Sequence, residues 1–205
     1  MCYATRFMQN EMDGAMARSN RPNRTKALVL GMIGGMVGVA ARRYYDREIA
    51  PDLFGREQPP RPAELPDPVE QRAMAAPYYR AGENDWETGA RLLYALAYRR
   101  EIPPETQEAW ADSLEWLYGV LIGATYGGTR TTTRARDFAG GFFFGIRLWL
   151  GQTIGLAYLG LRPGPTRYSA QAHLRLLVST WVFSFTATLV TRLLYRLLTP
   201  EDWGK

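Results

Sequence analysis

Apolar stretches with few charges alternate along this chain with charged, proline-rich stretches. The longest apolar stretch covers residues 138–161 (FAGGFFFGIRLWLGQTIGLAYLGL) and contains a single charge, Arg147. At about 1.5 Å per helical residue it would reach roughly 36 Å, which exceeds the hydrocarbon thickness of a bilayer, about 30 Å. The pattern predicts a transmembrane helix over residues 137–161.

Three further apolar stretches predict helices that accompany this one. They cover residues 26–45, 113–129 and 173–198. The first two fall short of about twenty apolar residues, but the charged side chains of Lys26 and Arg42 can snorkel to the interface and lengthen the first span. We therefore expect an all-α fold, an integral membrane bundle of about four transmembrane helices.

An acidic, proline-rich stretch separates the first span from the others. Residues 46–112 hold 8 Arg against 14 Asp and Glu, and seven prolines between positions 51 and 77 disfavour a long helix. We expect an extended extramembrane loop that ends in an amphipathic helix near 86–100, either on the membrane surface or capping the bundle. The expected parts are a basic tail (1–24), a first transmembrane helix (25–45), the acidic loop (46–112), and three more spans with a short tail (113–205).

Glycines recur every four residues in the first two spans. The first span carries two overlapping pairs and the second a series of three: Gly31 with Gly35, Gly34 with Gly38, and Gly119, Gly123 and Gly127. Such strips let two helix backbones approach closely in a bilayer, as in a glycine zipper. We therefore expect the first and second spans to pack together through Gly31, Gly35, Gly119, Gly123 and Gly127. A glycine-rich nucleotide loop would need a GK[ST] ending or a preceding strand, and the sequence predicts neither.

Charge indicates the environment of the chain more clearly than average composition does. A mean hydropathy of -0.27 is typical of a soluble protein, but the net charge of +5 comes from residues that border the apolar stretches. This distribution suits contact with a lipid bilayer and its anionic headgroups better than nucleic-acid binding. Most basic flanks fall on the side of the termini, so we expect an inner-membrane protein with both termini cytoplasmic; Arg42, Arg43 and Arg47 argue for the opposite orientation.

The N-terminal region carries no pattern of a cleaved secretory signal. The apolar stretch begins only at Ala27, and no A-x-A site follows it, so we expect it to be retained as an anchor. Translation could begin at Met1 or at Met16. The single cysteine, Cys2, excludes an intramolecular disulfide and a cysteine-based zinc site.

Several of these segments resemble the YagU-like family of uncharacterised bacterial inner-membrane proteins. The points of likeness are the glycine-rich first span, the proline-rich loop and three sequences: WLYGVLIGATYGG near Tyr118, GGFFFGIRLWLGQTIGLAYLGLRPGP (140–165) and YSAQAHLRLLVSTWVFSF (168–185). The resemblance implies a small multispan membrane protein and supplies no reaction. This chain differs in its longer loop with the added amphipathic helix.

Candidate chemistry centres on Arg147, because a charge near the middle of a span is costly to bury and commonly marks a functional site. Gln152 follows on the same span, and Glu115 is the one acid at the edge of another span. Arg147 could instead snorkel or bond to backbone carbonyls. His173, the only histidine, lies at the start of the last span, where a structural role is favoured over proton transfer.

No pattern of catalytic residues, cofactor-binding residues or metal ligands stands out, and we expect no cofactor and no enzymatic activity. Two classes of function remain. The first is a structural or accessory subunit that binds a membrane-protein partner, or a second copy of itself, through the acidic loop. The alternative is a small transporter or channel with an intramembrane polar site formed by Arg147, Gln152, Glu115 and His173.

Overall fold

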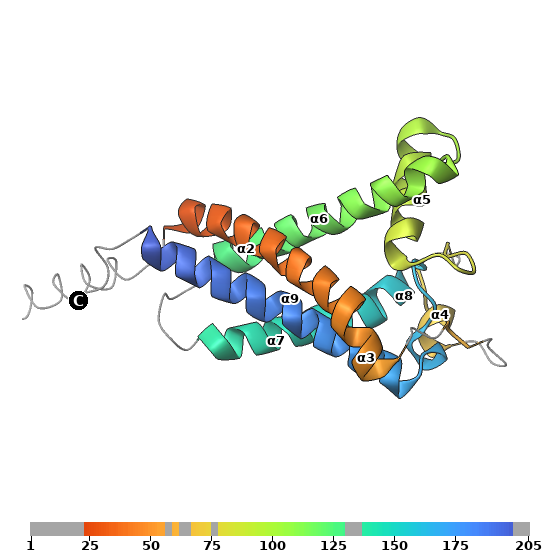
Figure 1. Cartoon of the computed structure of the whole chain (residues 1–205). Helices are drawn as coiled ribbons and strands as arrows, with labels where there is room; N and C mark the ends of the chain where they lie inside the picture. Colours follow the sequence, from red (N-terminus) through yellow and green to blue (C-terminus); the bar gives the residue numbers. More distant parts are fainter. Residues whose placement is uncertain (1–22, 56–58, 62–66, 75–77, 130–136, 199–205) are drawn as a thin grey trace, which may run out of the picture.

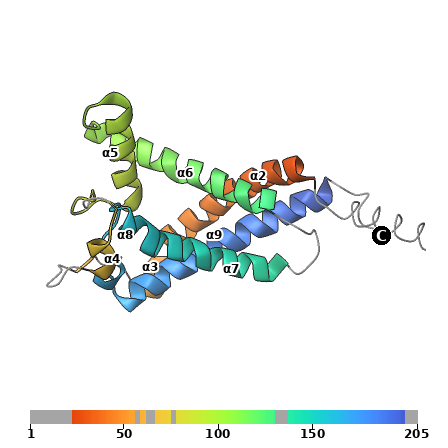
Figure 2. The ribbon, with the colours of Figure 1, turned by 180° about the vertical axis from the view of Figure 1, so that it is seen from behind.

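The computed structural model describes residues 23–55, 59–61, 67–74, 78–129 and 137–198, and over these residues the chain forms helices and no strand. Long helices run side by side along one axis, and shorter elements gather at one end (Figures 1 and 2). Residues 1–22 of the basic tail, which include Met1, Cys2 and Met16, and the 130–136 connection lie outside the described residues.

Two described helical runs are long and apolar enough to cross a membrane, Arg24–Phe54 and Ala170–Leu197. They correspond to the first and last of the four spans expected from the sequence. The 138–161 stretch, which the pattern marked as the clearest span, is not among them. Over this stretch the chain forms α7 (Asp137–Leu150), a π-helical turn, η2 (Gly151–Gly155), and the short helix α8 (Leu156–Tyr158).

The first helical run is longer than the sequence indicated. Helix α2 (Arg24–Tyr44) begins at an Asn23 cap and continues through a π-helical turn, η1 (Tyr45–Ile49), into α3 (Ala50–Phe54). The expectation of extended chain from residue 46 is therefore wrong up to Phe54. Pro51 is compatible with the helix because it lies at the start of α3, directly after the π-helical turn, where a missing N–H is tolerated.

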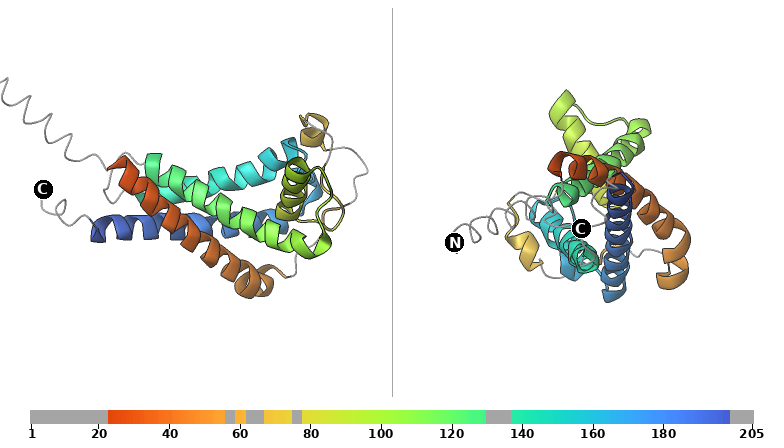
Figure 3. Two further views of the ribbon diagram at one scale, coloured as in Figure 1. Left: turned by 90° about the horizontal axis from the view of Figure 1, so that it is seen from above. Right: turned by 90° about the vertical axis from the view of Figure 1, so that its left-hand side faces the viewer.

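Helix α2 lies between α6 (Pro104–Thr129) and α9 (Ala170–Leu197), and its two glycine pairs face different neighbours (Figure 3). A Cβ added at Gly31 or Gly35 would come within 3.0 Å of backbone atoms of Gly123 or Gly119 on α6. A Cβ at Gly34 would meet α9 just as closely, at Thr191 and the Ala187 carbonyl. The backbones therefore approach so closely that side chains cannot fit between them.

Helix α7 packs on a neighbouring face of α9 and contacts it through Gly141 and Gly145, and its Leu148 joins Val39 of α2 in one core cluster. A Cβ at Gly145 would lie less than 3.0 Å from Ser184 and Trp181 of α9. Aromatic side chains fill the remaining space, because Phe144 packs against Phe183, with 6.4 Å between their ring centroids. The α7–η2–α8 run thereby joins the bundle.

Helix α5 (Asp85–Tyr98) lies across the end of α6, over the stretch expected to form an amphipathic helix (Figure 1). It starts with a capping box in which Asn84 accepts hydrogen bonds from two backbone N–H groups and Glu87 accepts one from the Asn84 N–H. Its inner face, with Ala90 and Tyr94, packs on Ala111 of α6. The short helix α4 (Pro68–Gln71) and the 3-10 turn η3 (Pro165–Arg167) complete this end.

Candidate functional site

Two arginines at the end of α2 organise the polar contacts between the helices. The Arg43 Nε donates to Glu115 Oε2 at 2.6 Å, and its Nη atoms contact both carboxylate oxygens of Asp112. Asp112 and Glu115 are three residues apart, on one face of α6, so one guanidinium group pairs with both. The Arg43 guanidinium also lies over the Trp116 ring, 5.8 Å from its centroid.

Arg42 connects α2 to α9 and to the π-helical turn η2. Its Nε donates to Ser179 Oγ of α9 at 3.0 Å and lies 3.5 Å from Asp46 Oδ2, and its Nη2 lies 3.5 Å from Gln152 Oε1 in η2. The Ser179 hydroxyl in turn donates to Asp46 Oδ2 at 2.9 Å. We call Arg42, Arg43 and the five polar residues that they contact (Asp46, Asp112, Glu115, Gln152 and Ser179) the arginine cluster.

The structure does not bring the four residues of the expected intramembrane site together. Glu115 and Gln152 belong to the arginine cluster, but Arg147 is exposed on the outer side of α7 and has no hydrogen bond or ion pair to any described residue. His173 is not part of the arginine cluster. Its Nε2 donates to the Pro165 carbonyl at 2.9 Å, and its ring makes a T-shaped contact with Trp149. Arg147 and Glu115 do not form a pair, because Arg43 already occupies that carboxylate.

Carboxylates of α4 hold the turn between α8 and α9. The buried Asp67 side chain accepts hydrogen bonds from the Thr166 N–H at 2.8 Å, from the Thr166 hydroxyl, and from the Val69 N–H at 2.7 Å. Burial alone would raise the pKa of Asp67, but these hydrogen bonds outweigh it and lower the pKa below its usual value. Glu70 accepts from the Gly164 N–H at 2.6 Å and from Arg167 Nη2 at 2.5 Å.

A second ion pair fixes the segment that precedes α5. Arg91 donates through Nε to Glu83 Oε1 and through Nη2 to Glu83 Oε2, both at 2.8 Å. Hydrogen bonds from Arg91, more than offsetting burial, lower the pKa of Glu83. We call the region held by these contacts (67–74, 78–103 and 159–169) the cap.

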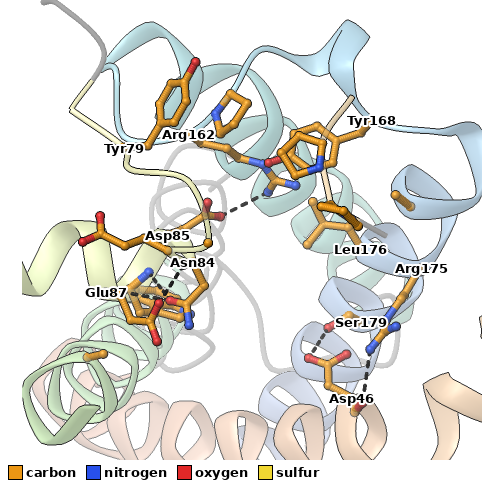
Figure 4. A pocket seen from close by; sticks show the side chains of 18 of the residues that line it. Asp46, Tyr79, Asn84, Asp85, Glu87, Arg162, Tyr168, Arg175, Leu176 and Ser179 are labelled. Carbon is orange, nitrogen blue, oxygen red and sulfur yellow. Dashed lines mark hydrogen bonds and ion pairs between the residues drawn. The ribbon is translucent and has the colours of Figure 1, made fainter. Parts of the chain in front are cut away.

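The cap and the arginine cluster line an open cavity of about 940 Å³ (Figure 4). Its walls come from the end of α2 with η1, the 59–61 segment, the starts of α5, α6 and α9, and the turn that includes Arg162 and Tyr168. Arg162 donates to Asp85 Oδ2 at 3.2 Å, and its guanidinium lies 4.4 Å from the centroid of the Tyr168 ring. Ligand pockets of this size accommodate small molecules and headgroups.

The lining side chains suit binding by charge and hydrogen bonds. Within the described ranges no group of three or more His, Cys, Asp or Glu residues could hold a metal ion. The arginines cannot act as acids or bases near neutral pH, and most of the acids are engaged in ion pairs. The cavity is therefore suited to hold a charged group.

Comparison with protein-family models, curated proteins and solved structures found no match to this chain. The resemblance to the YagU-like family thus stays a prediction.

The sequence did not predict that Arg43 pairs with two acids of α6, nor that Asp67 and Glu70 hold the turn before α9. One signal was available for Arg43, since Asp112 and Glu115 stand three residues apart at the start of a span while Arg42 and Arg43 stand at the end of another. Antiparallel packing through the glycines brings those two ends to one level. No local signal distinguished Asp67 and Glu70 from the other acids of the loop.

Proposed function

We propose that the chain is a small multispan inner-membrane protein with four spans, near residues 26–45, 113–129, 137–161 and 173–198. Support comes from the packing: α2 and α9 have the length and composition of membrane helices, and α6 and α7 lie against them over most of their length. Glycine-mediated backbone contact is the usual way in which helices associate in lipid. Four spans place the cap on one side and both termini on the other, which we propose to be cytoplasmic.

Within the membrane we propose an accessory role, in which the cap binds a partner protein. The observation that carries this proposal is that ion pairs hold the segments of the cap to one another, while its helix α5 exposes apolar side chains. On α5, Leu93 is 45% and Leu96 79% exposed. Rigid exposed apolar side chains outside a bilayer are typical of a protein interface.

A transporter built around Arg147 has less support. Arg147 lies on the outside of α7, and the contact between Gly31, Gly35 and Gly123 closes the space between α2 and α6 below the cavity. A transport route would need polar groups that continue along the bundle from the arginine cluster. The described residues place Thr153, Thr180 and Thr188 inside the bundle, but the Thr180 and Thr188 hydroxyls bond to carbonyls of their own helix.

Cysteine accessibility tests the proposed topology. In a background with Cys2→Ser, single cysteines replace Arg61 and Ala170 at the cap end and Thr129 at the other end. We expect an impermeant reagent to label the cap positions from outside intact cells and Thr129→Cys only after the membrane is opened. Labelling of Arg61→Cys from the cytoplasmic face alone would overturn the topology.

Co-purification in mild detergent tests the accessory role. We expect the parent chain to retain a stoichiometric partner and Leu96→Glu to lose it, because the new charge lies on the proposed contact face. Met74→Glu is the matched control, since Met74 is an equally apolar cap residue, 74% exposed, outside α5. A parent that purifies alone as a monomer, or a Leu96→Glu variant that keeps its partner, would contradict the proposal.

A further inference from the structure

Among the described residues that line the cavity, most charges lie close to an opposite charge, and five do not. Arg42, Arg43 and Arg162 each lie within 4.0 Å of a carboxylate of the same cavity. Three other lining arginines, Arg47, Arg61 and Arg175, have no carboxylate that close among the described residues, and neither Glu87 nor Glu108 has a cation that close.

The unpaired charges of opposite sign come from different elements of the cavity wall. The arginines come from η1, the 59–61 segment and the start of α9, whereas Glu87 and Glu108 come from α5 and α6. Figure 4 shows Glu87 and Arg175 on opposite sides of the hollow. Arg175 uses its guanidinium on the backbone oxygens of Gly55 and Asp46, at 3.1 and 3.3 Å, which orients it, while the nearby Asp46 carboxylate is already paired with Arg42.

A ligand with one charge would satisfy one wall and leave the other unmatched. A zwitterion satisfies both, because guanidinium groups bind phosphate oxygens through paired N–H donors and carboxylates bind an ammonium group. In the proposed membrane setting, on which this inference rests, the cavity lies at the end of the spans, where lipid headgroups are found. We infer that the cavity binds a phosphoethanolamine group, with its phosphate toward Arg47, Arg61 and Arg175 and its ammonium toward Glu87 and Glu108.

Binding to the purified full chain in detergent tests this inference, with thermal stabilisation and native mass spectrometry as readouts. The probes are dioleoyl phosphatidylethanolamine and dioleoyl phosphatidylglycerol, which share the phosphate but differ in the ammonium. We expect tighter binding of the ethanolamine lipid. Competition by free O-phosphoethanolamine would show that the headgroup alone suffices, whereas binding of the lipid without such competition would identify a membrane lipid as the source; both results support the site.

Two variants test the contacts to the phosphate and to the ammonium group separately. Arg61→Gln should weaken both lipids, by about tenfold, because it removes one charge-assisted contact to phosphate. Glu108→Gln should weaken the ethanolamine lipid by a similar factor and leave the glycerol lipid unchanged. Arg72→Gln and Glu105→Gln are the matched controls, because both residues are exposed and neither lines the cavity.

Equal binding of the two lipids, with no response to Glu108→Gln, would overturn the inference, and so would the absence of binding by either lipid. Parent-like melting temperatures of the variants without ligand verify that each one folds. A chain that binds the ethanolamine lipid but purifies without a partner would refute the accessory role alone. A chain that keeps its partner but binds no lipid would refute this inference alone.

Discussion

Different kinds of contact stabilise the two ends of the molecule. Below the arginine cluster, α2 packs against α6 and α9 through glycine and small residues. The close contact of the backbones depends on the lack of a side chain at these glycines. At the cap, α4, α5 and the 159–169 turn are joined by carboxylates and guanidinium groups. Backbone contact of the first kind tolerates no added volume, whereas contact of the second kind depends on the protonation and pairing of a few groups.

The largest expected effect is at the glycine contact. Gly35→Leu and Gly123→Leu insert a side chain where even a Cβ would lie less than 3.0 Å from backbone atoms. We expect each to lower the free energy of unfolding in detergent by about 3 kcal/mol or more, because neither backbone can move aside without separating the helices. Gly140→Leu is the control, since nothing lies within 4 Å of a Cβ there, and it should melt like the parent. Parent-like melting of Gly35→Leu would remove the packing argument.

The next effect is at the junction between the two ends. Arg43→Leu leaves Asp112 and Glu115 beside each other without their cation, and we expect a loss of about 2 kcal/mol, measured by chemical unfolding in detergent. The triple variant Arg43→Leu, Asp112→Leu, Glu115→Leu should recover much of that loss, because no unpaired charge remains. A single Arg43→Leu variant as stable as the parent would show that this ion-pair group contributes no stability.

A smaller effect is expected on the stability of the cap at acidic pH. The pKa values of Asp67 and Glu83 are lowered in the folded chain, so their stabilisation is present above the ordinary carboxyl pKa of about 4 and is lost as the pH falls through the lower folded values. We expect hydrogen exchange of the cap to rise below about pH 4 while that of α2 stays slow. Glu83→Gln, costing about 1 kcal/mol at pH 7, should flatten part of this dependence. Equal acid responses at both ends would contradict the comparison.

The smallest effect is expected at Arg147. Because its side chain is exposed and has no partner among the described residues, Arg147→Leu should leave the free energy of unfolding in detergent unchanged or raise it, since the variant removes a charge from the proposed span. Arg147→Lys keeps the charge and should melt like the parent. Liposome flux and the phenotype of a deletion strain, measured for both variants, test the functional side. A loss of either function in Arg147→Lys with intact folding would restore Arg147 as a functional residue.

The parts of this structure that follow from the sequence are those set by spacing along one helix. Glycines four residues apart must share a face, so the contact of Gly31 and Gly35 with α6 could be inferred from periodicity. The capping box before α5 is equally local, since Asn84 and Glu87 stand three residues apart. In both cases the partner groups are near in sequence or repeat at a fixed interval.

The parts that could not be inferred depend on how distant elements meet. Glu115 was the only candidate partner for Arg147 by position along the spans, yet Arg43 reaches it because α2 and α6 are antiparallel and in register through their glycines. The contact of Asp67 with Thr166 joins residues 99 positions apart and requires the turn after α8 to fold back on α4. Nothing in the local pattern of a proline-rich loop specifies such a pairing.

The two π-helical turns have a consequence for how this chain could change in evolution. Each accommodates one residue more than an α-helix of the same rise, and each lies beside the arginine cluster, η1 just after Arg42 and η2 around Gln152. Removing that residue from η1 would restore regular helix and leave α3 with nearly the same face toward its neighbours. Single-residue deletions at these two points can thus be absorbed locally, while α3, α8 and the buried glycine faces keep their register.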